Sequence, residues 1–200
     1  ADEVLFLDAR GARRVPQARL VFLGTRHPNP AVPRHEMAAK AEAAAAGLGP
    51  ASETVVFLEW VDIEEREALL LEADAGVSLH PVHVETRYSV RARIIDCFWA
   101  KLPVVVTDGD VGAEWVREHG VGRVVPPGDA AAVAHALVEV LERPRREWEG
   151  GYAPLHEALR WERLVEPLAR FCLGGAPGAP DEPRSRPPEA ARPLPPPPGA

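Results

Sequence analysis

The chain has 200 residues, of which 46% are hydrophobic and 26% charged, as is usual for a soluble globular protein. Its 30 acidic and 23 basic side chains give a net charge of −7, which argues against a nonspecific nucleic-acid binder. No stretch approaches the ~20 apolar residues of a membrane helix, and no signal peptide is visible. We therefore expect no transmembrane segment, a cytoplasmic location and two reduced, buried thiols, Cys97 and Cys172.

The first 73 residues alternate short apolar runs with helical segments. The strand runs are rich in valine, leucine and phenylalanine, the first long helix is rich in alanine, and prolines keep the loop between them from forming a helix. Asp62 is expected to cap the next helix. In chain order we predict a helix (less favoured, a strand) at 4–14, a strand at 19–23, a loop at 25–33, a helix at 35–48, a strand at 54–58 and a helix at 62–73.

The same alternation continues to residue 171. Ser89 and Asp129 are expected to cap helices, because their side-chain oxygens can accept from the first free backbone N–H groups. Gly120 and Gly122 lie between a helix and a strand, where a helix C-cap and turn is expected. The predicted elements are strands at 75–79, 104–107 and 122–125, helices at 89–100, 112–119 and 129–141, and two helices within 152–171.

Five strands alternating with helices predict an α/β fold with a Rossmann-like parallel sheet covered by helices on both faces. The strands are apolar throughout, as expected of a sheet that is buried on both sides. We predict one domain at 1–173 and a disordered tail at 174–200. The tail is rich in proline and contains Leu194 as its one large aliphatic residue, so it cannot form a core. Docking of SH3-like partners is the alternative to a plain solvated tail.

Polar residues gather where the 75–79 strand ends and the next helix begins. In an open parallel sheet, ligands bind outside the carboxyl ends of the strands, and a helix start favours phosphate. No dinucleotide fingerprint and no P-loop is present. The residues at this edge are His80, His83, Glu85, Arg87, Ser89, Arg91 and, after the following strand, Asp108 and Asp110.

Each group at this edge has more than one interpretation. His80, His83 and Glu85 are two imidazoles and a carboxylate that could bind a metal, but substrate contact is favoured. The arginines at 87, 91 and 93 form either a pyrophosphate clamp or a solvated charged face. Asp96 lies among apolar neighbours and needs a partner, either Arg93 or a ligand hydroxyl. Trp60 either packs or stacks on a base, and packing is favoured.

Several segments together resemble the C-terminal half of a bacterial family 4 glycosyltransferase of group 1, with GT-B architecture. The resemblance covers about residues 18–172 and includes a stretch of the form ETRYS-x-R-x-R-x-x-D in the cleft. The matching segments are Leu20–Gly24, Val55–Val61, Leu69–Ser78, Asp96–Val105 and Gly120–Asp129.

The resemblance implies a domain that binds a nucleotide diphosphate sugar and takes part in sugar transfer with retention, with no metal or other cofactor. Asp96 matches the acidic residue that holds the ribose, and 59–61 match the segment that meets the base. The usual sugar-contacting glutamate falls at Tyr88, and Glu85 lies three residues earlier. The implied catalytic residues are Glu85 and Arg91. The implied donor-binding residues are Gly24, Arg26, Trp60, Val61, His80, Arg87, Tyr88, Ser89, Val90, Asp96 and Asp110.

Proteins of this family are normally longer. The acceptor-binding N-terminal domain and the first strand of the donor domain find no match, so we expect the natural start to lie upstream of Ala1 and the chain to be inactive alone. The alternatives are a noncatalytic, partner-binding or vestigial module and a nucleotide-sugar epimerase of the same architecture. The inner face of a membrane is a second expected location.

Overall fold

A computed structural model describes residues 18–34 and 36–174 of the protein. The predictions for 4–14 and for the tail beyond 174 lie outside the described residues. The chain divides into two compact units, Ala1–Glu157 and Ala158–Ala200, and each is described by itself. None of the helices in the described part of the chain is long and apolar enough to cross a membrane.

The first unit begins with a parallel pair of strands, β1 (Leu20–Phe22) and β2 (Val55–Phe57). Both lie within the predicted strand ranges. They are connected through helix α2 (Glu36–Ala46) and the 3₁₀ helix η1 (Gly49–Thr54). The rings of Phe22 and Phe57 stack at 5.0 Å between centroids, so the paired strands also share an aromatic contact.

A second parallel sheet contains three strands in the order β3, β4, β5. Their bounds are Gly76–Ser78, Val104–Thr107 and Gly122–Val125. The middle strand β4 is buried along its whole length, which explains why its sequence, VVVT, shows no polar alternation. The predicted bounds of β4 and β5 are confirmed.

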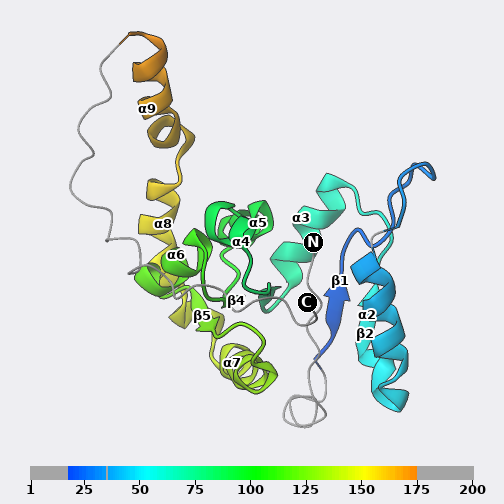
Figure 1. Ribbon diagram of the computed structural model, residues 1–200. Coiled ribbons are helices and arrows are strands. Elements are labelled where there is room, and N and C mark those ends of the chain that lie inside the picture. The colour runs from blue at the N-terminus through cyan, green and yellow to red at the C-terminus, as the bar shows by residue number, and fades with distance from the viewer. Residues whose placement is uncertain (1–17, 35, 175–200) are drawn as a thin grey trace, which may run out of the picture. The chain divides into compact units, whose positions relative to one another are not determined.

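Three helices pack against this second sheet: α5 (Ala92–Trp99), α6 (Val111–His119) and α7 (Ala130–Glu142). Figure 1 shows α5 and α6 on one side of β4 and β5, and α7 on the other. Phe98 and Trp115 meet edge to face between α5 and α6, with ring centroids 6.4 Å apart. The α/β class, with parallel sheets flanked by helices, is therefore confirmed.

In each sheet the strands follow one another in chain order. The first sheet has the order β1, β2 and the second the order β3, β4, β5. Within the described residues, the strands therefore form two sheets instead of the single sheet that the alternation of elements predicted.

Helix α3 (Ile63–Glu72) precedes β3 and corrects one prediction. Asp62 occupies the N-cap position, but its side chain makes no capping hydrogen bond. Its Oδ1 instead accepts from the indole Nε1 of Trp60 at 3.2 Å. The indole competes for the carboxylate, which sequence spacing alone does not reveal.

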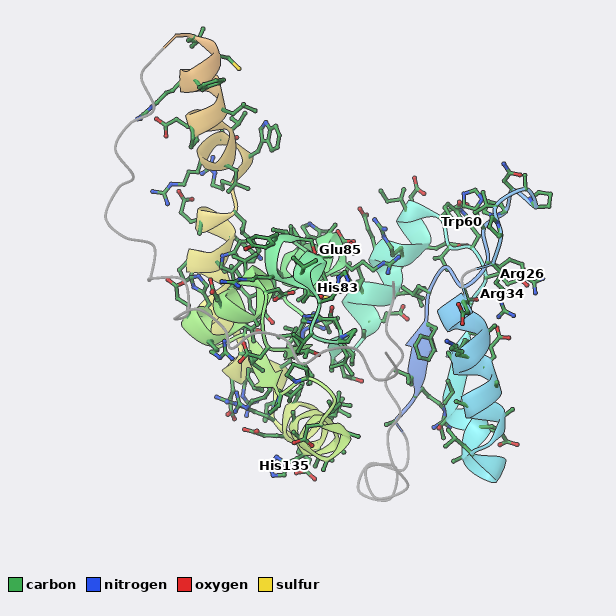
Figure 2. The ribbon with its side chains drawn as sticks, in the orientation of Figure 1. Arg26, Arg34, Trp60, His83, Glu85 and His135 are labelled. Carbon is green, nitrogen blue, oxygen red and sulfur yellow. The ribbon has the colours of Figure 1, made fainter. Side chains whose placement is uncertain are left out.

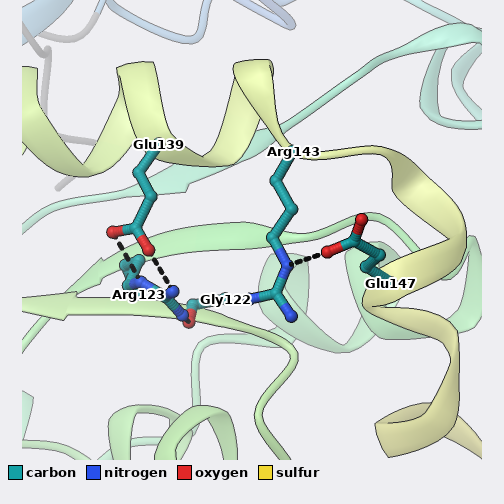
Figure 3. Close-up of polar contacts among 5 residues, drawn as sticks. All are labelled: Gly122, Arg123, Glu139, Arg143 and Glu147. Atoms are coloured by element: carbon teal, nitrogen blue, oxygen red, sulfur yellow. Dashed lines mark hydrogen bonds and ion pairs between the residues drawn. The ribbon is translucent and has the colours of Figure 1, made fainter.

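An aromatic–arginine cluster lies at β5, an edge strand of the second sheet, and Figure 3 shows its two arginines with their acidic partners. The buried Trp148 lies between two guanidinium groups, those of Arg123 on β5 and Arg143 after α7, at 4.8 and 4.3 Å from the ring. Arg123 also forms a two-pronged ion pair with Glu139, with Nε to Oε2 at 2.8 Å. The cluster therefore ties β5 to α7 and to the segment that follows it.

The chain continues through two 3₁₀ helices, η2 (Arg145–Glu147) and η3 (Glu149–Gly151), into helix α8 (Tyr152–Ala158). Helix α9 (Trp161–Cys172) belongs to the second unit. The prediction of two helices within 152–171 is confirmed. The prediction of two buried thiols is met only in part for Cys97, which is partly buried, and is wrong for Cys172, which is exposed.

Candidate functional site

The candidate site lies at the carboxyl ends of β3 and β4. These strands are parallel neighbours, with Ser78 opposite Val106. The segments that follow them, 79–91 and 108–110, therefore leave the sheet at the same edge. His80 follows β3, and its backbone N–H donates to the hydroxyl of Thr107, the last residue of β4, at 3.0 Å.

A buried imidazole and carboxylate meet at this edge. The His80 side chain is 1% exposed and the Asp110 side chain is 3% exposed, and Nε2 lies 3.4 Å from Oδ2. This contact is not a hydrogen bond, and within the described residues Nε2 has no hydrogen-bond partner. The other oxygen of Asp110 accepts from the backbone N–H of Ala113 at 2.7 Å and caps α6.

The segment after β3 contains a short helix, α4 (Val84–Tyr88), that the sequence did not predict. The His83 ring caps it, with Nδ1 accepting from the backbone N–H of Glu85 at 3.2 Å. Thr86 is buried, and its hydroxyl donates to the Pro81 carbonyl at 3.4 Å. Glu85 itself is exposed, and Figure 2 shows it near His83 at this end of the sheet.

Ser89 does not cap the following helix as predicted. Its backbone N–H donates to the Glu85 carbonyl at 2.9 Å, which makes it the C-cap of α4. Helix α5 begins three residues later than predicted, at Ala92, with Arg91 in the N-cap position. The extended backbone at Ser89 separates two short helices where the sequence suggested a single one.

The outward side of α4 carries exposed apolar surface. The side chain of Tyr88 is 76% exposed, and the Arg87 guanidinium lies over its ring at 5.7 Å. Val90, in the link to α5, is also exposed. These three predicted donor contacts therefore face solvent, where a ligand or another domain can reach them.

A pocket of about 330 Å³ lies beside β3 and the start of α5. Its lining includes Val77 and Ser78 of β3, the following Leu79, and Arg91, Arg93 and Cys97 of α5 and its N-cap. The Nε of Arg91 is buried, and no hydrogen-bond acceptor for it occurs in the described part of the chain. A guanidinium with an unused donor beside a helix start and a pocket is suited to an anionic ligand.

Asp96 lies on α5 but is not among the residues that line this pocket. Its Oδ2 is 3.7 Å from a guanidinium nitrogen of Arg66 on α3, and both side chains are partly exposed. Arg66 is thus one partner of Asp96, in addition to the two that the sequence suggested, Arg93 and a ligand hydroxyl. Arg66 was missed, because nothing in the pattern of α3 indicates that it faces α5.

The pocket wall also contains a thiol. Burial, together with the nearby Asp96 carboxylate, raises the pKa of Cys97 to about 12. The Cβ that an alanine would add at Gly76 would lie 2.8 Å from its Sγ, so the thiol packs directly on the first residue of β3. Cys97 is therefore a packing group in this state and not a nucleophile.

A second group of predicted residues lies at the carboxyl ends of β1 and β2 (Figure 2). Gly24 has a positive φ of 69°, which turns the chain after β1. Arg26 pairs with Glu59 at 3.1 Å, and Trp60 packs edge to face on His27 at 5.0 Å. Trp60 is half exposed, and the neighbouring Val61 is partly buried.

The predicted residues thus fall into two groups, one at each sheet. His80, Arg91 and Asp110 gather around the ends of β3 and β4, while Gly24, Arg26 and Trp60 follow β1 and β2. Sequence reasoning missed Thr107, although its place at the end of an apolar strand was the available signal. No group of three metal-ligating side chains occurs in residues 18–34 and 36–174.

The sequence matches the family described as "Glycosyl transferases group 1" over residues 4–143. Comparison with curated protein sequences found no match. The fold is similar to that of a sucrose-phosphate synthase from Thermosynechococcus elongatus, with a TM-score of 0.63 and 19% identity over 82% of this chain and 40% of that one.

The fold is also similar to that of WaaG, a glycosyltransferase involved in lipopolysaccharide biosynthesis. The TM-score is 0.54 and the identity 16%, over 87% of this chain and 56% of the WaaG chain. The chain therefore spans about half of the length of these two proteins or less. At such low identity, the two likenesses establish the fold alone.

Proposed function

Because the chain belongs to the group 1 glycosyltransferases, we propose that it forms the donor-binding part of an enzyme that transfers a sugar from a nucleotide diphosphate. The transfer retains the anomeric configuration, and the acceptor site is supplied by the rest of a longer protein. The observation that carries this proposal is the buried, unsatisfied Nε of Arg91 beside the pocket at the start of α5.

The chemistry of the leaving group supports this role for Arg91. When the bond between the sugar and the diphosphate breaks, negative charge builds on the phosphate oxygens. A guanidinium and the free N–H groups at the start of α5 can stabilise this charge with donors that are already in place. Arg87, which lies over Tyr88 on the solvent side of α4, provides a second cation in the same segment.

We assign the remaining predicted residues to the two ends of the donor. Asp96 accepts from the ribose hydroxyls, since its partly exposed carboxylate can accept from more than one donor. Glu85 contacts the sugar, and the backbone of 88–90 holds the diphosphate. Gly24, Arg26, Trp60 and Val61 meet the base, for which the half-exposed indole offers a stacking surface.

Isothermal titration calorimetry with UDP-glucose and GDP-glucose tests this assignment on the longer parent protein. We expect one of the two to bind, and Asp96→Ala to weaken its binding about tenfold or more, because a charged acceptor for two hydroxyls is lost. The matched control is Asp74→Ala. Asp74 is an exposed carboxylate just before β3, at the opposite end of the same strand.

Two outcomes contradict the proposal. If neither nucleotide sugar binds the parent protein, donor binding is wrong. If Asp74→Ala weakens binding as much as Asp96→Ala, the effect is one of net charge and not of a ribose contact. For the isolated chain we expect binding without transfer, measured by release of the nucleoside diphosphate. Turnover of the donor without any acceptor would instead favour an epimerase.

A further inference from the structure

The buried pair of His80 and Asp110 connects three parts of the site. The His80 backbone N–H is bonded to Thr107 at the end of β4, and its ring Nδ1 lies 3.4 Å from the Pro81 carbonyl. The Asp110 carboxylate caps α6 through Ala113. Contact between the two side chains therefore joins the start of the 81–91 segment to the turn between β4 and α6.

The Asp110 carboxylate and the Ile94 side chain of α5 both approach Gly112, near the start of α6. A Cβ at Gly112 would lie 3.2 Å from Asp110 Oδ1 and 3.2 Å from the δ-methyl group of Ile94. Ile94 is buried and stands three positions after Arg91. Ile94 of α5 and Asp110 of the pair thus border the same glycine, which places the pair next to the helix that Arg91 precedes.

The pair is held in place but only partly satisfied. A buried imidazole nitrogen without a hydrogen bond carries a cost in free energy, and the Asp110 carboxylate is its one charged neighbour among the contacts described. Such an arrangement lowers the stability of the fold. A role in fixing the loop and the helix start around the pair would account for this cost.

We propose that His80 and Asp110 are positioning residues, which hold the 81–91 segment and the start of α5 so that the Arg91 guanidinium faces the diphosphate. They act through the backbone and Ile94 and do not touch the donor, unlike the direct donor contact that the sequence predicts for both. This inference rests on the proposed function for the identity of the ligand. The contact between His80 and Asp110, called the latch below, can itself be tested without any ligand.

Amide hydrogen exchange followed by mass spectrometry tests the latch on the free protein. Asp110→Asn keeps an oxygen to cap Ala113 but removes the charge that faces His80. We expect amides in 81–91 to exchange about tenfold faster in this variant, while those of α7 are unchanged. The matched control is Asp129→Asn, because Asp129 also caps a helix, through Ala132 at 2.9 Å, but is exposed and faces no imidazole.

Variants of His80 provide a second test by the same hydrogen-exchange measurement. His80→Ala removes the ring, and His80→Gln retains an N–H donor near the position of Nε2, so exchange in 81–91 should be faster in the first than in the second. If His80→Ala fails to fold, Asp110→Asn decides the question. Unchanged exchange in 81–91 overturns the proposal. So does an equal increase over β4, β5 and α7, which would indicate a merely structural role.

Binding then shows whether the latch serves the diphosphate. In the parent protein, we expect Asp110→Asn to weaken UDP or GDP binding about tenfold and to leave the weaker binding of UMP or GMP unchanged, because Arg91 meets only the diphosphate end. Equal weakening of both nucleotides contradicts the positioning of Arg91. If the wild-type protein binds no nucleotide, the proposed function fails, whereas the exchange results still decide the latch.

Discussion

At the scale of single residues, two adjacent glycines illustrate how the environment decides the cost of a side chain. A Cβ on Gly151 would lie 1.9 Å from the carbonyl oxygen of His119, which is backbone and cannot turn away. A Cβ on Gly150 would meet nothing within 4 Å. The sequence contains the two glycines as a simple pair, and only the approach of the end of α6 distinguishes them.

We therefore expect Gly151→Ala to lower the free energy of unfolding by about 2–3 kcal/mol, since the last residue of α6 must move to admit the methyl group. Gly150→Ala, the matched control, should change it by less than about 0.5 kcal/mol. Urea denaturation followed by circular dichroism measures both. Equal effects of the two substitutions would show that the close approach at Gly151 does not exist in solution.

At the scale of elements, the ion pair between Arg123 and Glu139 joins β5 to α7 (Figure 3). The hydrogen bond from Arg123 lowers the pKa of the Glu139 carboxyl below its usual value. As the pH falls, the unfolded chain takes up this proton before the folded chain does. The stabilisation from the pair is thus fully present above the usual carboxyl pKa of the unfolded chain. It is lost as the pH falls through the lowered pKa of Glu139 in the folded chain.

Glu139→Gln should accordingly cost about 0.5–1 kcal/mol at pH 7, a modest figure because both side chains are about one third exposed. The difference from the wild type should shrink as the pH falls below about 4, where the wild-type carboxylate also takes up its proton. Thermal unfolding across pH 3 to 7 measures this. Glu142→Gln is a control for the loss of charge alone, because Glu142 lies three residues after Glu139 on α7. A constant difference at every pH would contradict the assignment.

At the scale of the whole molecule, the two thiols report on different units. Cys97 lies in the first unit, where burial raises its pKa to about 12, and Cys172 is exposed in the second. Since only the accessible thiolate reacts, iodoacetamide at pH 8 should modify Cys172 quickly and Cys97 only when the first unit opens. Mass spectrometry of the labelled chain measures both rates, and Cys172→Ser gives the rate for Cys97 alone.

Labelling of Cys97 should then follow the denaturant dependence of unfolding of the first unit. Rapid modification of both thiols without denaturant would mean that the pocket wall beside β3 is open in the native protein. That result would also weaken the proposed site, because the same wall carries Arg91.

Much of this architecture was predictable from local signals. The apolar runs at 104–107 and 122–125 marked two strands to the residue, and Asp129 was correctly expected to cap α7. The start of α5 was not predicted correctly, because a serine can cap the start of a helix with its hydroxyl or end the preceding helix through its backbone N–H, as Ser89 does. The predicted roles of the site residues in donor binding stay predictions.

The order of apolar runs, glycines and capping residues is enough to determine an α/β chain with parallel strands, because these signals act over a few neighbouring residues. Partners far apart in the chain required the tertiary structure. Asp96 meets Arg66, and His80 meets Asp110, only because crossovers bring α3 to α5 and the end of β3 to the start of α6. No periodicity encodes such pairs, since they depend on how separate elements pack, and it is this packing that decides which polar groups are buried.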